Sequence, residues 1–244
     1  MNPSIESESD TIFEVPDVII LGQPRSGTHF LEESLASHPQ IRGRGECFLR
    51  YQRFLAQGVS IEPIKKRLFI NKRHRVNVGI LMYYLVDFFT KKFGAISDYR
   101  ILHILRNPRD IAVSVAQMEA DRLHFGRDYR VHRKLHHPAP VHAPILIQKV
   151  KEIEAKAMQM QQGFCRRLGS LPNVLTIDYD IITAGRQTNK LPEKYARLLL
   201  DFLHLPYHPL ENALQKTGVS RPVGNGSEFV SEFPDGAVPP ENRQ

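Results

Sequence analysis

The chain has 244 residues, of which 41% are hydrophobic and 24% are charged, as in an ordinary globular protein. This composition excludes a disordered chain, a collagen and a coiled coil, and two cysteines are too few for a disulfide scaffold or a cysteine-built zinc site. The 33 Lys and Arg residues outnumber the 26 Asp and Glu residues and give a net charge of +7, which favours an anionic ligand.

The length fits a single α/β domain, since such folds often reach about 250 residues. We expect residues 1–14 to form a flexible N-terminal tail and residues 15–244 to form one domain. No apolar run approaches the roughly 20 residues of a membrane-spanning helix. The acidic, polar N-terminus is unlike a secretory signal peptide. These features predict a cytoplasmic protein without a transmembrane segment.

Short apolar strands and helices are expected to alternate along the chain. The expected strands are 18–22, 67–70, 100–105 and 174–177, the helices are 28–37, 78–93, 109–120, 145–168 and 192–203, and 122–142 and the segment from about 216 are loops. This alternation predicts a parallel sheet covered by helices, with ligands at the carboxyl ends of its strands. Loops beginning at Gly22, Asn71, Arg106 and Asp178 should therefore carry the functional residues.

The first of these loops, residues 22–28, has the composition of an anion site. Gly22 and Gly27 stand between an apolar strand and a helix, so backbone N–H groups and the helix N-terminus can face an anion. The nucleotide-hydrolase pattern G-x-x-x-x-G-K-[ST] would have Lys after the second glycine, where this chain has Thr28. Arg25 supplies a cation from within the loop, and its guanidinium suits bidentate contact with an oxyanion.

Two signatures in this order resemble the sulfotransferases that use 3′-phosphoadenosine 5′-phosphosulfate (PAPS). PRSGTHFLEESLASHP resembles the 5′-phosphosulfate loop of that family. ILHILRNPRDIAVSV resembles its 3′-phosphate signature, with Arg106 and Ser114 eight residues apart. The resemblance covers about residues 17–234. Within the family, the chain looks most like bacterial carbohydrate sulfotransferases, such as the enzyme that sulfates Nod factor.

The resemblance implies a P-loop-type three-layer α/β fold with a central parallel sheet flanked by helices. It also implies PAPS as cofactor, 3′-phosphoadenosine 5′-phosphate (PAP) as product, and no metal. The reaction would transfer a sulfuryl group to a hydroxyl of a small-molecule or glycan acceptor, such as a carbohydrate or glycolipid.

The same resemblance implies which residues contact the cofactor. Ser26 and Thr28 would donate to the 5′-phosphate, and Arg25 would stabilise the sulfuryl group. Arg106 and Ser114 would hold the 3′-phosphate. The other expected contacts are Gly27, His29, Tyr179 at the position of the family's Tyr-Glu dipeptide, and Lys216 and Arg221 in a loop that closes over the nucleotide.

The general base has two candidates, since it must lie near the end of the 22–28 loop. Glu46 stands after the loop-helix unit, where tyrosylprotein and many bacterial sulfotransferases have a Glu that acts as the general base. The alternative for Glu46 is a surface pair with Arg42 or Arg44. His74 matches the K-x-H pattern of cytosolic sulfotransferases, although it is followed by a longer segment before the 3′-phosphate signature.

Lys72 is expected at a strand end to contact the transferring group and the leaving oxygen, with a solvated lysine as the alternative.

Residues 122–142 combine five histidines with five Lys and Arg residues. Their spacings fit no standard metal site, and we expect a solvated loop or a lid at the acceptor site.

Two other functions compete with sulfuryl transfer. An ATP-dependent small-molecule kinase would normally have the lysine that the 22–28 loop lacks. The positive charge would suit a nucleic-acid-binding protein, but the basic residues are dispersed or confined to one loop. We therefore expect no nucleic-acid partner, and the sequence leaves the oligomeric state open.

Overall fold

The computed structural model describes residues 11–58, 61–64, 76–126, 143–183 and 190–211. Several predictions fall outside this part of the chain and stay predictions. They are the strand over 67–70, the loop at Asn71, the roles of Lys72, His74, Lys216 and Arg221, the loop from about 216, and residues 127–142 of the histidine-rich segment.

Five parallel strands form the central sheet, in the order β3-β5-β2-β6-β7. These strands are β2 (Val18–Gly22), β3 (Ile41–Gly43), β5 (Val76–Met82), β6 (Arg100–Leu105) and β7 (Val174–Asp178). The central strand, β2, pairs with β5 and β6, and all five of its residues are buried. The expected parallel sheet and three of its predicted strands are thus confirmed.

The chain changes sides beside β2. It passes from β2 through α1 (Thr28–Ala36) to β3, and through α2 (Cys47–Ala56) to β5, on one side of the central strand. It continues through α3 (Val86–Phe93) and a short 3₁₀ turn (Ile96–Asp98) to β6 on the other side. In open parallel sheets, ligands bind at such a switch point, outside the carboxyl ends of the strands.

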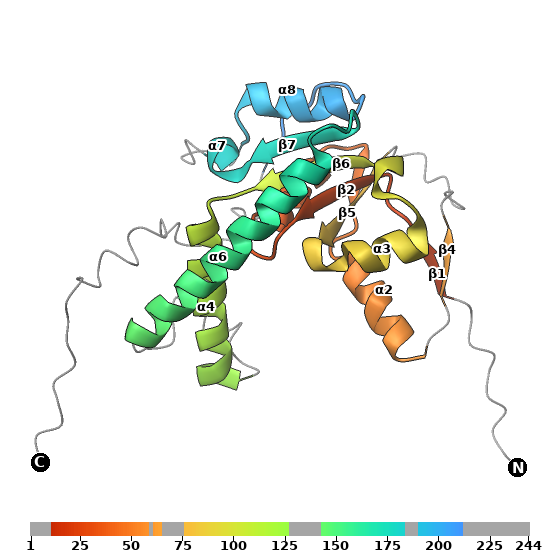
Figure 1. The fold of residues 1–244 in the computed structure, drawn as a ribbon. Coiled ribbons are helices and arrows are strands. Elements are labelled where there is room, and N and C mark those ends of the chain that lie inside the picture. Colours follow the sequence, from red (N-terminus) through yellow and green to blue (C-terminus); the bar gives the residue numbers. More distant parts are fainter. Residues whose placement is uncertain (1–10, 59–60, 65–75, 127–142, 184–189, 212–244) are drawn as a thin grey trace, which may run out of the picture.

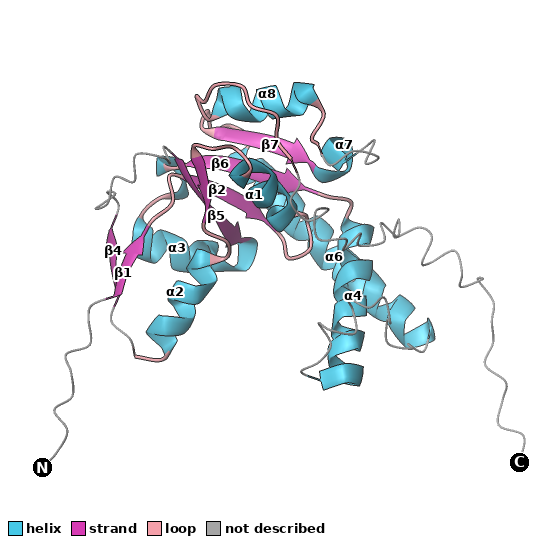
Figure 2. Ribbon diagram, turned by 180° about the vertical axis from the view of Figure 1, so that it is seen from behind, coloured by secondary structure: helices cyan, strands magenta, loops and turns pink. Residues whose placement is uncertain are grey.

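Helices cover both faces of the sheet, as expected for a three-layer α/β fold. α1 lies on one face and α6 (Ala143–Leu168) crosses the other (Figures 1 and 2). α4 (Pro108–Phe125) follows β6, whereas α7 (Tyr179–Thr183) and α8 (Glu193–Phe202) follow β7. α4 and α6 extend together away from the sheet (Figure 1) and share a cluster of Ala112, Ala116 and Val150.

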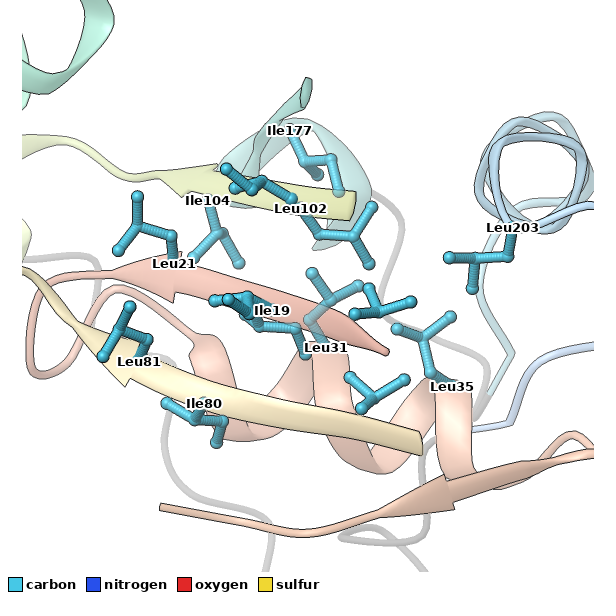
Figure 3. Packing of buried hydrophobic residues seen from close by; sticks show 14 of the residues in the cluster. Ile19, Leu21, Leu31, Leu35, Ile80, Leu81, Leu102, Ile104, Ile177 and Leu203 are labelled. Atoms are coloured by element: carbon cyan, nitrogen blue, oxygen red, sulfur yellow. The ribbon is translucent and has the colours of Figure 1, made fainter. Parts of the chain in front are cut away.

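The hydrophobic core joins α1 to the central strands. Ile19, Leu31 and Leu35 are fully buried and lie close together (Figure 3). Leu31 and Leu35 are one helical turn apart, so a single face of α1 packs against the sheet. Burying one such side chain contributes roughly 1.5–3 kcal/mol. This packing fixes the helix whose first residues follow the 22–28 loop.

The helix expected over 78–93 is wrong in its first half. Residues 76–82 form β5, Tyr83–Leu85 form a 3₁₀ turn, and only Val86–Phe93 are α-helical. A continuous apolar run has no period that separates a buried strand from a buried helix. The tertiary environment decides here, because every residue of β5 is buried between β2 and β3.

Other segments also differ from the sequence prediction. Part of the expected N-terminal tail forms β1 (Thr11–Glu14), which pairs in parallel with β4 (Ile61–Ile64). α4 continues to Phe125, into the segment expected to be a loop. Strand β3 was not predicted, because it has only three residues and two of them are exposed. Helix α2 was not predicted either.

Candidate active site

The 22–28 loop forms a tight turn between β2 and α1. The backbone N–H and the Oγ of Ser26 both donate to the carbonyl oxygen of Gln23, at 3.2 and 2.8 Å. Arg25 and Gly27 have left-handed backbones, with φ of 72° and 97°. Gly27 is the N-cap of α1 and has no side chain to cap it. The helix therefore begins with backbone donors directed at the loop, an arrangement suited to an anion.

Close contacts explain both glycines of the loop. A Cβ on Gly22 would lie 2.6 Å from Ser26 Oγ and 2.7 Å from Ile104 Cγ2. A Cβ on Gly27 would collide with the ring of Tyr179, which comes from α7. The motif residues Ser26 and Thr28 are both buried. The loop is thus shaped by packing against β6 and α7 as well as by its own turn.

Two arginines and a serine from distant segments meet at the loop. Arg106, which follows β6, donates from Nη1 to the carbonyl oxygen of Arg25 at 2.9 Å. Arg25 donates from Nε to Ser114 Oγ of α4 at 2.8 Å. The Arg106 guanidinium lies over the Tyr179 ring, 4.8 Å from its centroid. The structure therefore brings together Arg25, Arg106, Ser114 and Tyr179, four of the predicted cofactor contacts.

Side chains absent from the prediction hold this arrangement in place. Gln161 of α6 donates to the carbonyl oxygen of Arg106 at 2.8 Å, and Gln23 donates to that of Ala157 at 3.0 Å. Asp180 accepts from the backbone N–H of Asn107 at 3.3 Å. No motif marks Gln161, since its partner stands 55 positions earlier in the chain. Only the crossing of α6 over the sheet reveals its contact.

Glu46 lies on the opposite flank of the loop, beside His29 at the start of α1. The imidazole Nε2 of His29 is 3.2 Å from Glu46 Oε1, and its Nδ1 is 3.8 Å from Glu32 Oε2. Glu32 is buried and accepts the backbone N–H of Gly45. The neighbouring carboxylates of Glu32 and then Glu46 raise the pKa of His29 to about 9, against its partial desolvation. His29 is therefore protonated at neutral pH.

Sequence reasoning missed Glu32 and Tyr84 in this region. Glu32 carried a usable signal, because a carboxylate three residues after His29 on a helix reaches the same face. Tyr84 follows β5, which was expected to be helical, and 55% of this residue is exposed. Partial burial raises the pKa of Tyr84, and the charge of Glu46 adds to this effect. Tyr84 thus lies within electrostatic reach of Glu46.

None of the helices that the structure describes is both long and apolar enough to cross a membrane. Among the same residues, no three His, Cys, Asp or Glu side chains gather as metal ligands would.

Residues 16–76 match the sequence model of the sulfotransferase family. No curated protein matches the chain.

Solved structures similar to this chain include three sulfotransferases. The enzyme from Alicyclobacillus acidocaldarius is 17% identical with a TM-score of 0.47, and 90% of this chain and 91% of that one are covered. Mouse SULT7A1, solved in complex with PAP, is 15% identical with a TM-score of 0.43, covering 89% and 68%. STF9 from Mycobacterium avium is 11% identical with a TM-score of 0.42, covering 90% and 68%.

The matched segment contains the 22–28 loop, α1 and Glu46. Over residues 16–76, about a quarter of the chain, this protein is thus similar to the sulfotransferase family.

Proposed function

We propose that this protein is a sulfotransferase that takes its sulfuryl group from PAPS. One observation carries the proposal: the 22–28 loop lies inside the family match, and Arg106 and Ser114 reach that loop from outside the matched segment. Two guanidinium groups and an uncapped helix N-terminus make the site suitable for a ligand with several anionic groups.

The residues around the loop fit such a nucleotide. The N-terminus of α1, with Thr28, would hold the 5′-phosphate, and Arg106 with Ser114 would hold the 3′-phosphate. Ser26, whose N–H and Oγ both donate to Gln23, would shape the loop around that phosphate. Within the described residues, the buried Nε of Arg106 has no hydrogen-bond acceptor, as expected of a donor that serves a ligand. Tyr179 packs against both Gly27 and the Arg106 guanidinium and would fix the position of these two groups relative to each other.

The bound cofactor would supply the sulfuryl group and leave as PAP. The acceptor oxygen forms the new S–O bond, and the old bond to the 5′-phosphate oxygen breaks with its electron pair on that oxygen. Glu46 takes the proton of the acceptor hydroxyl, and Arg25 neutralises charge on the oxygens of the transferring group. Glu46 suits this role because its carboxylate lies beside the first turn of α1.

The acceptor class rests on the sequence resemblance, which favours a hydroxyl of a carbohydrate or glycolipid. A cytoplasmic location likewise stays a prediction of the sequence. The exposed Tyr84 ring near Glu46 offers an apolar surface on which an acceptor could rest.

Calorimetric titration with PAP, 5′-AMP and magnesium-free ATP tests the proposal. We expect tight binding of PAP and at least tenfold weaker binding of 5′-AMP, because only PAP carries the 3′-phosphate. Equal affinity for all three nucleotides, or no binding of PAP, would contradict PAPS dependence. Preferential binding of ATP would instead favour the kinase alternative.

A further inference from the structure

His29 occupies an unusual position for a positive charge. It is the second residue of α1, where the partial positive charge of the helix N-terminus disfavours a cation. An anion bound at the same helix end would attract a protonated imidazole. The two ring nitrogens of His29 face carboxylates instead. The side chain is half-exposed. Its orientation therefore needs an explanation other than cofactor binding.

The two carboxylates beside the ring favour its protonated form. A neutral imidazole has one N–H donor and one lone pair, so it can satisfy only one acceptor of the two that it faces. Here Nε2 faces Glu46 at 3.2 Å and Nδ1 faces Glu32 at 3.8 Å. Only the doubly protonated ring presents a donor to both carboxylates. The raised pKa of His29, about 9, agrees with this geometry.

Glu32 links the cluster to the backbone that carries Glu46. One of its oxygens accepts the N–H of Gly45, while the other faces His29. A Cβ on Gly43 would lie only 2.7 Å from Glu32 Oε1, so the 43–45 backbone is pressed against this carboxylate. The carbonyl oxygen of Gly45 accepts from the N–H of Ile80 in β5 at 2.9 Å. The backbone before Glu46 is thus held on two sides.

We propose that His29 is a positioning residue, which as a cation shared between Glu32 and Glu46 holds the Glu46 carboxylate beside the 22–28 loop. Glu32 fixes the backbone on which Glu46 stands, and His29 fixes its side chain. The role replaces the direct cofactor contact that the sequence suggested for His29. This inference rests on the proposed function, in which Glu46 is the base.

NMR titration of the intact chain tests the electrostatic part. The ring carbons of His29 should titrate with a midpoint near pH 9, against the ordinary value of 6.5. Glu46→Gln should lower this midpoint by at least one pH unit, whereas His204→Asn, at an exposed left-handed position, should leave it unchanged. A wild-type midpoint near 6.5, or one that Glu46→Gln does not move, would overturn the proposal.

The NMR signal of the Glu46 carboxyl carbon tests whether His29 acts on Glu46. In the wild type, the Glu46 side-chain carboxyl carbon should show an inflection near pH 9, and the inflection should vanish in His29→Gln. A residue that only fills space would produce no such inflection, and its absence in the wild type overturns the role. If His29→Gln does not fold, the wild-type inflection still decides.

Calorimetry with PAP separates this inference from the proposed function. His29→Gln should keep the PAP affinity of the wild type within about threefold, because a positioning residue makes no cofactor contact. A tenfold or greater loss would overturn positioning in favour of cofactor binding. Failure of the wild type to bind PAP would refute the proposed function while leaving the titration of the cluster intact.

Discussion

Glu46 shows how much a single side chain depends on its immediate neighbours. Its position after the loop-helix unit made it the preferred base, with a surface ion pair to arginine as the alternative. The structure places its Oε1 against the imidazole of His29, itself in contact with buried Glu32. Its assignment as the base remains a proposal that the following variants test.

Glu46→Gln is expected to lower kcat for sulfuryl transfer from PAPS by about 10²–10⁴-fold, the usual contribution of a general base. An amide keeps the shape of the side chain but cannot take the hydroxyl proton. The PAP affinity should change little, because Glu46 faces His29 and has no phosphate-binding role in the proposed reaction. The measurement is sulfate transfer to a panel of glycans and glycolipids.

Glu193→Gln provides the matched control for this experiment. Glu193 is an exposed carboxylate of α8 that pairs with Arg197, and its replacement should leave transfer unchanged. If Glu46→Gln is fully active while His74→Ala is inactive, the base is His74.

Strand β6 contains a buried histidine whose environment has a consequence for stability. His103 is fully buried and its Nε2 pairs with the hydroxyl of Tyr83, which stacks on Phe164 of α6. Burial lowers the pKa of His103 to about 4. The folded protein therefore holds this ring neutral, whereas the unfolded chain takes up a proton below its ordinary pKa of 6.5.

The free energy of unfolding should fall as the pH drops from about 6.5 to about 4, at up to about 1.4 kcal/mol per pH unit from this group. The sign follows because the unfolded state binds more protons over this range. The measurement is denaturant unfolding as a function of pH. The double variant Tyr83→Phe/His103→Leu removes both polar groups together and should lose this part of the pH dependence.

His204→Asn is the control, since His204 is exposed and should leave the acid-side slope of the wild type intact. An identical slope in the wild type and the double variant would show that other groups cause the acid destabilisation.

On the scale of the whole molecule, the cofactor side of the site is assembled at the switch point of the sheet. Arg25 follows β2, Arg106 follows β6 and Tyr179 follows β7, so three neighbouring strands deliver these side chains to one edge. α6 crosses the sheet and ties both loops down through Ala157 and Gln161. The site is therefore a property of the sheet order.

Arg106→Ala is expected to weaken PAP binding by about 10–100-fold, because a charge-assisted hydrogen bond contributes roughly 1.5–3 kcal/mol. Calorimetry with PAP and 5′-AMP measures the effect, which should be much smaller for 5′-AMP. Arg109→Ala is the matched control, because Arg109 is exposed on the first turn of α4. Unchanged PAP affinity in Arg106→Ala would remove this residue from the 3′-phosphate site.

Local sequence patterns predict the strands with clear boundaries and the motifs that follow them. β2 and β6 are short apolar runs that end in a glycine turn and an Asn-Pro turn, and their local patterns need no tertiary information. The composition of the 22–28 loop selected Arg25, and the resemblance to sulfotransferases selected Arg106, Ser114 and Tyr179. These four residues lie together in the structure.

The identity of β5 and the partners of the motif residues depend on tertiary contacts that no local pattern contains. The run 76–82 lacks a period, and its burial between two strands makes it a strand. The contacts of Arg25 with Ser114 and of Arg106 with Gln161 join residues far apart in sequence, so no local pattern encodes them. The cluster of His29, Glu32 and Glu46 likewise exists because β5 and α1 hold the 43–46 backbone between them.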